Sequence, residues 1–420
     1  MKKEIVFFGL LFLSLSIFGQ ERTIIDVEIK GQQKTRVNVI KSFLETKTNS
    51  VLDSTTLDKD VKRLKKLPAI SHAYYQVEKK ENNTFQVLFY IEENKTLIPV
   101  VNFWTTTNKQ FAYKLGLYEY NFLGRNMAFG GFYQNNGYHS YALNFRAPYL
   151  FSNRLGLAFN HQNWTSEEPL YFNNGSANYK YQNISFETML LYEAGFKNTF
   201  EFGINFFKEK YNYKSGLTST TIPQELNINK TLLKFIYSYD GLEYYYQYLH
   251  GFKNQLFVEM VTTENEFQED FFIAWNDLFY FRRMGAKGNW ANRLRIGLST
   301  NNESPFAPFA LDNNVNLRGV GILVDRGTGS IIYNTEYRHT LLEKGSFTIQ
   351  SNVFTDFGSW RTPGGKLSDF TKKENIRIFS GVGLRIINKK VFNAIFRIDY
   401  GYELTDGKSK GLVFGIGQYF

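Results

Sequence analysis

The sequence contains no cysteine in its 420 residues. This absence excludes disulfide bonds, catalysis by a cysteine thiolate and zinc sites with cysteine ligands. It also excludes a lipoprotein, because no cysteine is present to accept the lipid. Only 21% of the residues are charged, yet 43% are hydrophobic and 18% are aromatic, so the composition is not that of an intrinsically disordered chain.

Long hydrophobic runs are scarce as well, and the only one spans residues 5–18. This run is too short to cross a bilayer as a helix, which excludes a helical membrane protein. It follows a basic N-terminus, and Ser16 and Gly19 at its end supply small residues at the positions that a signal peptidase reads. We therefore predict a signal peptide over residues 1–19 and export of the remaining chain. An uncleaved anchor helix is the alternative.

No segment of the sequence concentrates positive charge, although the formal net charge is +10. Lysine and arginine are spread along the whole chain and are interspersed with acidic residues. A phosphate backbone is bound by clusters or stripes of basic residues. The sequence therefore predicts no nucleic-acid partner.

The hydrophobic spacing of residues 23–94 changes from strand to helix and back to strand. Ile25, Val27 and Ile29 alternate with polar residues, which predicts a strand that ends at Gly31. Helical spacing then predicts two helices, and two further strands follow over residues 73–79 and 85–91. We expect Thr35 to cap the first helix, Thr55 or Thr56 to begin the second, Pro68 to stop it, and Asn82 and Asn83 to form the final turn.

This β-α-α-β-β order resembles a POTRA domain, here assigned to residues 23–97. The resemblance also rests on Gly31-x-x-Lys34-Thr35, on Leu52-Asp53 before the second helix, and on the closing Glu92-Glu93-Asn94. It implies a periplasmic module that binds extended polypeptide by adding it as a strand to the edge of a sheet. A spacer that only holds a barrel near its partners is the alternative.

After Pro99 the helical spacing disappears, and short segments of alternating hydrophobicity take its place. Leu155, Leu157 and Phe159, for example, alternate with smaller or polar residues. In an outer-membrane barrel the apolar positions face lipid and the polar ones face the lumen. The export signal, the aromatic content and a last strand that ends on Phe420 favour such a barrel over a soluble sandwich. We predict about sixteen antiparallel strands over residues 98–420.

Several motifs together resemble the BamA/TamA superfamily of outer-membrane assembly and translocation proteins. The resemblance covers about residues 23–420. Leu317 and Val320 depart from the superfamily pattern at the tip of the sixth extracellular loop. The motifs, in chain order, are Asn121-Phe122-Leu123-Gly124-Arg125, Ala147-Pro148-Tyr149-Leu150, Asn316-Leu317-Arg318-Gly319-Val320, Glu336-Tyr337-Arg338 and Phe354-Thr355-Asp356-Phe357-Gly358.

The last three motifs predict a clamp inside the barrel. The period of two places Glu336 and Asp356 in the lumen if Tyr333 and Val353 face lipid. Residues 301–329 form a long polar segment that can fold back into the barrel. Arg318 would then meet both acids, because a guanidinium shielded from water needs carboxylate partners. Gly319 would permit close backbone approach, and Gly358 completes the predicted site. An exposed loop arginine beside two unrelated acids is the alternative.

The superfamily resemblance implies a factor for outer-membrane protein assembly or polypeptide translocation. Client strands would pair at the POTRA edge and at a lateral seam between the first strand, expected at residues 111–120, and the last, residues 412–420. Within that last strand, Phe414, Ile416 and Phe420 are expected to face outward and to carry the seam and the C-terminal insertion signal. Partners would be outer-membrane lipid, unfolded client polypeptides and periplasmic or lipoprotein accessory subunits.

The single POTRA domain departs from the usual pattern, since general assembly factors of the superfamily carry several. A specialised paralogue is therefore as compatible with the sequence as a general factor. A passive pore with a vestigial POTRA domain and a dedicated two-partner-type secretion transporter are the alternatives.

We expect no enzymatic activity, cofactor or metal site. The five histidines lack metal-binding spacing, and the sequence contains neither a nucleophile elbow nor a glycine-rich phosphate loop. An outer-membrane hydrolase that uses an Asp–His pair in the lumen is the alternative, although its nucleophile would have no signature here.

Overall fold

The computed structural model describes most of the chain beyond its N-terminus. The predicted signal peptide, residues 1–19, lies outside the described residues, as does part of the predicted inward loop. The described ranges are residues 22–105, 111–172, 175–218, 222–263, 269–302, 307–312, 316–320, 325–406 and 409–420.

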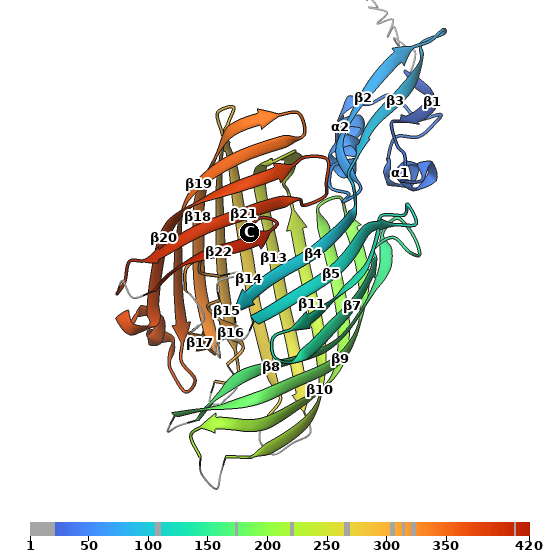
Figure 1. Cartoon of the computed structure of the whole chain (residues 1–420). Helices are drawn as coiled ribbons and strands as arrows, with labels where there is room; N and C mark the ends of the chain where they lie inside the picture. Colours follow the sequence, from blue (N-terminus) through green and yellow to red (C-terminus); the bar gives the residue numbers. More distant parts are fainter. Residues whose placement is uncertain are drawn as a thin grey trace, which may run out of the picture.

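A small α/β domain precedes the barrel (Figure 1). Its three strands lie in the order β1-β3-β2, with β1 parallel and β2 antiparallel to the central strand. Apolar residues of both helices pack on this sheet in one core. None of the described helices is long and apolar enough to cross a membrane. The elements are β1 (Thr23–Lys30), α1 (Val37–Phe43), α2 (Ser54–Leu64), β2 (Ile70–Lys79) and β3 (Thr84–Glu93).

The two helices begin differently. The Asp53 side chain caps α2 by accepting the backbone N–H groups of Thr55 and Thr56 at 3.0 and 3.2 Å. The predicted cap of the first helix is wrong, because Arg36 takes the N-cap position without a side-chain bond. Thr35 instead accepts a hydrogen bond from Asn121 of the barrel at 2.9 Å. Its hydroxyl therefore serves docking between domain and barrel.

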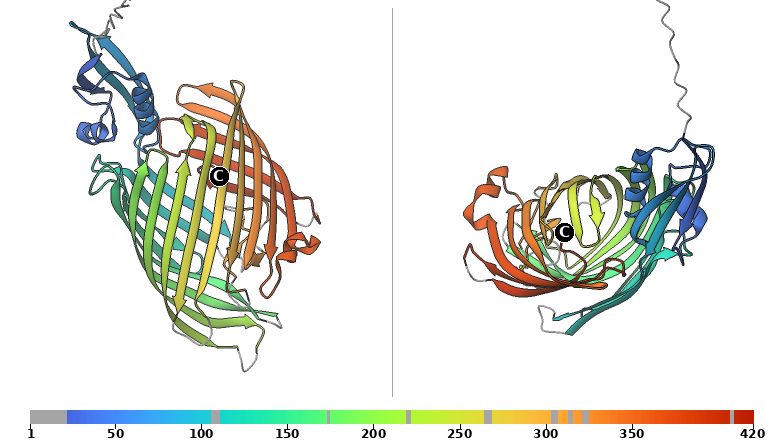
Figure 2. Two further views of the ribbon diagram at one scale, coloured as in Figure 1. Left: turned by 180° about the vertical axis from the view of Figure 1, so that it is seen from behind. Right: turned by 90° about the horizontal axis from the view of Figure 1, so that it is seen from above.

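Sixteen strands form the wall of a closed antiparallel barrel, which confirms the predicted fold class. The N-terminal domain stands over one side of the ring (Figure 2). We call the end of the barrel beside this domain the near end and the opposite end the far end. The wall strands are β4 (Leu97–Thr105), β5 (Phe111–Phe122), β6 (Met127–Asn135), β7 (His139–Ala147), β8 (Leu155–Phe172), β9 (Gly175–Gly195), β10 (Asn198–Gly216), β11 (Glu225–Asp240), β13 (Tyr248–Thr263), β14 (Phe271–Met284), β15 (Gly288–Ser299), β18 (Gly329–Lys344), β19 (Phe347–Arg361), β20 (Ile376–Asn388), β21 (Ile395–Glu403) and β22 (Lys410–Ile416).

Several short elements lie outside the wall. A three-residue strand pairs with the start of β13 at the near end, and a two-stranded ribbon belongs to the segment between β15 and β18. Two 3-10 turns follow β19 at the far end (Figure 1). These elements are β12 (Glu243–Tyr245), β16 (Phe309–Ala310), β17 (Arg326–Gly327), η1 (Leu367–Thr371) and η2 (Lys373–Asn375).

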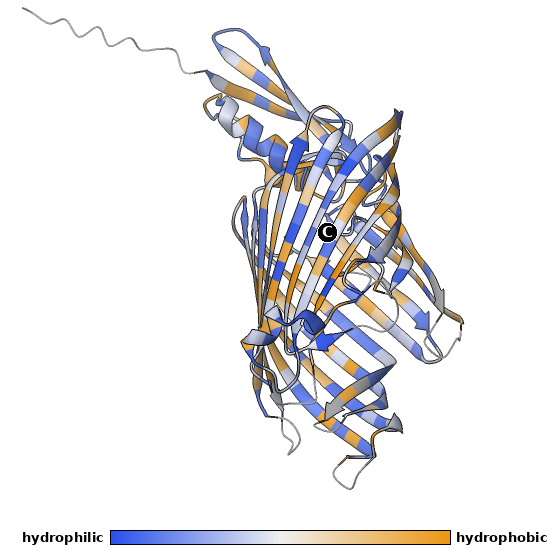
Figure 3. Ribbon diagram, turned by 90° about the vertical axis from the view of Figure 1, so that its left-hand side faces the viewer, coloured by the Kyte–Doolittle hydropathy of each residue, from blue (hydrophilic) through white to orange (hydrophobic). Residues whose placement is uncertain are grey.

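Hydrophobic and hydrophilic residues alternate along the strands of the wall (Figure 3). Large apolar side chains such as Leu143, Val353 and Val382 are exposed on the outer face. Polar side chains at the intervening positions, such as Asn334 and Asn352, are buried inside the barrel. An apolar outer band with a polar lumen is the arrangement of an outer-membrane barrel.

The first wall strand is β4, so the prediction that residues 111–120 begin the barrel is wrong. Those residues belong to β5, the second strand. β4 starts at Leu97, the last residue of the predicted POTRA domain, and it contains Pro99. A proline inside a strand is tolerated at an edge, where its missing N–H costs no ladder bond. The sequence analysis therefore missed the strand that contains Pro99, which lies at the barrel closure, where β4 adjoins β22.

The N-terminal domain is docked against several near-end turns of the barrel. Arg63 of α2 pairs with Glu193 at 2.7 Å, and both side chains are largely buried. The Phe43 ring meets the edge of Tyr149 at a centroid distance of 4.6 Å. At Gly124 an added Cβ would lie 2.3 Å from the backbone oxygen of Lys34, so the turn requires glycine there. The two turn motifs of the sequence thus form docking points for the domain.

We expect the closed barrel to resist unfolding by detergent. Unheated protein should migrate faster on a denaturing gel than boiled protein, because the intact ladder of backbone hydrogen bonds keeps the barrel compact. Equal mobility of the two samples would contradict the closed wall.

Candidate functional site

A loop segment from the far end reaches the interior of the barrel. Asn334 on β18 donates to the backbone oxygen of Asn316 at 2.8 Å, and Asn316 donates to that of Ala310 at 2.7 Å. Leu317 is completely buried in an apolar cluster that includes Trp360 of β19. These contacts hold residues 316–320 inside the lumen and direct the next side chain, Arg318, towards the wall.

Arg318 has no solvent exposure and binds Asp356 of β19 through three groups. Its backbone N–H and Nε donate to Asp356 Oδ2 at 3.0 and 2.9 Å, and Nη2 donates to Oδ1 at 2.8 Å. A bidentate pair of this kind fixes the plane of the guanidinium as well as its position. The remaining terminal nitrogen, Nη1, donates to Glu336 Oε2 on β18 at 2.5 Å.

Glu336 binds two further buried arginines. Arg338 Nε donates to Glu336 Oε1, and Arg385 Nη2 donates to both carboxylate oxygens at 2.9 and 3.0 Å. A second acid, Asp399 of β21, accepts from Arg397 Nη1 at 3.1 Å and lies 4.0 Å from Arg318. We call these seven charged residues the arginine cluster, which comprises Arg318, Arg338, Arg385, Arg397, Glu336, Asp356 and Asp399.

Two aromatic rings complete the surroundings of Arg318. Its guanidinium carbon lies 3.6 Å from the centre of the Phe354 ring and 4.4 Å from that of Tyr419. The Tyr419 ring also lies 4.8 Å from the guanidinium of Arg397. Contacts between a cation and a ring face become stronger when water is excluded, as it is here.

Glycines allow the loop and the wall to approach closely. Gly319 has φ +100°, and a Cβ there would lie 2.7 Å from the backbone oxygen of Gly401. A Cβ at Gly358 would lie 2.8 Å from a methyl carbon of Leu317. Any larger residue at Gly319 or Gly358 would push the loop away from the wall and pull Arg318 from its partners.

The structure thus brings the predicted clamp residues, Arg318, Gly319, Glu336, Asp356 and Gly358, into one site. The sequence analysis missed Arg385, Arg397, Asp399 and Tyr419 as members of this site. The first three were detectable in principle, because each is an inward-facing polar residue in a strand whose outward positions are apolar. Nothing in the pattern of the sequence marked Tyr419.

The predicted seam and insertion residues lie in two different environments. Phe414 and Ile416 are on the outer face of β22, with 67% and 38% exposure. The predicted outward position of Phe420 is wrong, because the chain leaves the wall at Gly417, which has φ +91°. Phe420 packs inside the barrel beside Phe281, and its backbone oxygen accepts from Arg338 Nη2 at 3.2 Å. The Arg338 guanidinium lies 5.6 Å from the centre of the Phe420 ring, a contact that favours the inward position over the one in lipid that alternation predicts.

The arginine cluster is suited to positioning rather than to bond chemistry. Its carboxylate oxygens accept hydrogen bonds from guanidinium groups, which holds both partners in fixed positions. Within the described part of the chain, no three His, Asp or Glu side chains are grouped so that they could hold a metal ion. What the cluster does is fix the loop, β18, β19 and the residues after β22 relative to one another.

Comparisons with known proteins agree with this architecture. Residues 23–94 match the POTRA family, described as surface antigen variable number repeat. No curated protein sequence matches the chain.

Solved structures match nearly the whole chain. The crystal structure of BamA from Haemophilus ducreyi lacking POTRA domains 1–3 is 13% identical, with a TM-score of 0.56 over 93% of this chain and 83% of that one. CdiB from Acinetobacter baumannii is 11% identical, with a TM-score of 0.58 over 95% and 74%. CdiB from Escherichia coli is 10% identical, with a TM-score of 0.57 over 94% and 74%. The chain therefore shares the fold of these structures, and in it a POTRA domain precedes a β-barrel.

We expect Arg318→Ala to destabilise the barrel by about 3 kcal/mol, because it leaves Asp356 and Glu336 buried without their cation. Arg326→Ala is the matched control, since Arg326 belongs to the same inter-strand segment but pairs with Glu168 where both side chains are partly exposed. The measurement is the temperature at which the fast-migrating gel band disappears. The same temperature for both variants would show that the buried pairing contributes nothing.

Proposed function

We propose that this protein assembles or translocates polypeptides at the bacterial outer membrane. The barrel would reside in that membrane, with the POTRA domain in the periplasm. Its clients would be unfolded or extended polypeptides, and periplasmic or lipoprotein subunits would assist it. The proposed activity requires no enzymatic step, cofactor or metal, because its driving force is the pairing of backbone groups that lipid cannot satisfy.

The main support for this proposal is the short strand β22 at the closure of the barrel. β22 has seven residues, the fewest of the sixteen described wall strands, and it adjoins β4, which has nine. Elsewhere in the wall, β8 and β9 pair over eighteen residues. The number of ladder hydrogen bonds between β22 and β4 is limited by the length of β22. This seam is therefore the place where the wall opens at the lowest cost and offers an edge to a client strand.

The edge of the POTRA sheet supports a first capture step. β2 lies at the edge of the three-stranded sheet, and its inner side pairs with β3. The exposed side chains of Tyr74 and Val77 lie on this strand. Pairing along a strand edge uses backbone groups that every polypeptide carries, so one edge serves many client sequences. We propose that clients pair with β2 before they reach the seam between β22 and β4.

Locking the seam tests the proposal. A panel of cysteine pairs, one residue from positions 98–102 and one from 411–415, should include a pair that forms a disulfide across the seam. The sequence has no native cysteine to compete. We expect the locked protein to insert stably but to lose its cellular function, which a reductant should restore.

A disulfide between Val353→Cys and Val382→Cys is the control, because these outward-facing residues are paired on β19 and β20, away from the seam. This pair should leave function intact. If the seam lock also leaves function intact while deletion of residues 23–94 changes only ion conductance, the protein is a passive pore and the proposal fails.

A further inference from the structure

The turn between β11 and β13 leaves the barrel wall. The β11–β13 ladder ends at the pair Asp240 and Lys253, whereas the chain forms a separate hairpin beyond it. We call residues 241–251 the strap. Gly251 has φ +116°, and a Cβ there would lie 2.7 Å from the backbone oxygen of Gly241. The strap therefore bends away from the wall at two facing glycines, a position that permits rotation of the hairpin.

The strap contacts the inner faces of strands that are not its neighbours. Asn289 of β15 binds the backbone of Leu249 twice, donating to its oxygen and accepting its N–H, each at 2.9 Å. The hydroxyl of Tyr248 bonds to that of Thr340 on β18 at 2.8 Å. In the wall, β15 and β18 lie two and three places from β13. The strap consequently crosses the near-end mouth of the lumen, where Figure 2 shows it inside the ring of strands.

Apolar contacts hold the strap in this position. Leu242 packs against Phe281 and Ala291, which are 3% and 0% exposed. Phe420 packs against the same cluster. The strap thus covers both the inner wall of β14 and β15 and the residue that contacts Arg338 of the arginine cluster.

The POTRA domain contacts the strap and its base from outside. Lys66 Nζ donates to the backbone oxygen of Asp240 at 2.7 Å, and Lys62 pairs with Glu243 at 2.6 Å. The ring of His72 stacks on that of Tyr246 at a centroid distance of 5.1 Å.

The outer contacts of the strap include a stacked histidine ring and a solvent-exposed ion pair. Burial lowers the pKa of His72, which favours the neutral form of the stacked ring. The side chains of Lys62 and Glu243 are about half exposed, at 52% and 55%, so salt screens this pair. On the inner side, Leu242 is buried in an apolar cluster and the Tyr248 hydroxyl bonds to Thr340, while the Arg283 guanidinium lies 4.7 Å from the centre of the Tyr248 ring.

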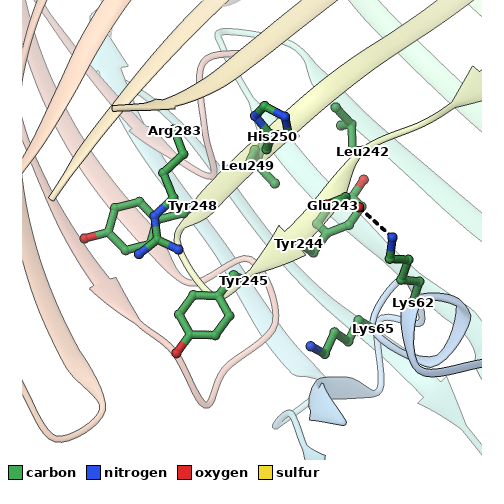
Figure 4. A pocket seen from close by; sticks show the side chains of 10 residues that line it. All are labelled: Lys62, Lys65, Leu242, Glu243, Tyr244, Tyr245, Tyr248, Leu249, His250 and Arg283. Atoms are coloured by element: carbon green, nitrogen blue, oxygen red, sulfur yellow. Dashed lines mark hydrogen bonds and ion pairs between the residues drawn. The ribbon is translucent and has the colours of Figure 1, made fainter. Parts of the chain in front are cut away.

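Between α2 and the strap lies a cavity of about 340 Å³. Figure 4 shows Lys62 and Lys65 on the POTRA side of this cavity and the strap residues opposite. The domain is thus joined to the strap by a few polar and stacking contacts rather than by a continuous core. Contacts of this kind separate without exposing buried apolar surface.

We propose that the strap is a lid over the near-end mouth of the lumen, and that docking of the POTRA domain stabilises its closed position. When the domain moves away, the outer contacts break and the strap rotates about Gly241 and Gly251. The mouth then opens, and Phe420 loses part of its packing. This inference does not depend on the proposed function, because a lid of this kind would also control a passive pore.

A single reporter cysteine tests the lid. Ala291→Cys places a thiol beneath Leu242 in a sequence that has no other cysteine. We expect slow labelling of the full chain by a charged maleimide. The variant Lys62→Ala/Lys66→Ala/His72→Ala removes the three outer contacts described above and keeps the hydrogen bond from Tyr246 to Glu92. It should be labelled at least about tenfold faster, the factor expected when a 1.4 kcal/mol bias towards the closed position is lost. Lys59→Ala is the control, since Lys59 is exposed on the same helix and lies outside the contacts described above.

A second variant tests whether the strap itself covers the lumen. Replacing residues 242–250 with Asn-Gly removes the strap and should give the fastest labelling, together with higher ion conductance in planar bilayers. If labelling is unchanged in this variant, the strap does not cover the lumen and the proposal is wrong. If labelling rises without the strap but not in the triple variant, the domain does not control the strap and the proposal is equally wrong. All variants should retain heat-modifiable gel mobility, which shows that the barrel is folded.

Discussion

The burial of one arginine, Arg318, is the constraint on which the interior of this barrel depends. A guanidinium without contact to water is strongly destabilising unless carboxylates surround it at hydrogen-bond distance. Asp356 and Glu336 meet that requirement from adjacent strands, and each is held in turn by other polar groups. The loop that carries Arg318 is therefore tied to β18 and β19, and its apolar neighbour Leu317 fills the space against Trp360.

The arginine cluster also fixes the position of residues 417–420. Tyr419 lies against Arg318 and Arg397, and Phe420 lies against Arg338. These contacts draw residues 417–420 out of the wall and shorten the last strand to seven residues. The seam with β4 is consequently short because the residues that would extend β22 are engaged in the lumen. The arginine cluster thus holds both the loop, residues 316–320, and the residues that follow the last strand of the barrel.

The two ends of the lumen are occupied by different parts of the chain. Residues 316–320 belong to a segment that enters from the far end, and the strap crosses the near end. Phe420 contacts both systems, since it packs with Leu242 of the strap and with Arg338 of the arginine cluster. The strap, Phe420 and the arginine cluster are thus in contact inside the barrel, and the POTRA domain reaches the strap through polar and stacking contacts.

The amino-acid sequence alone predicted the order of the POTRA elements, the barrel class and the face of most strand residues, because the period of two is a local property of the backbone. It also pointed to Arg318, Glu336 and Asp356 through motifs that resemble a known superfamily. The folded structure was needed to show that Arg385, Arg397 and Asp399 join these residues and that β4 begins the wall. It was also needed to show that Phe420 turns inward and that residues 241–251 cross the near-end mouth of the lumen. These features depend on closure of the ring and on glycines with positive φ, such as Gly251 and Gly417, because both bring residues distant in sequence together. Alternation specifies which side of the wall a residue occupies, but not which residue it meets across the lumen.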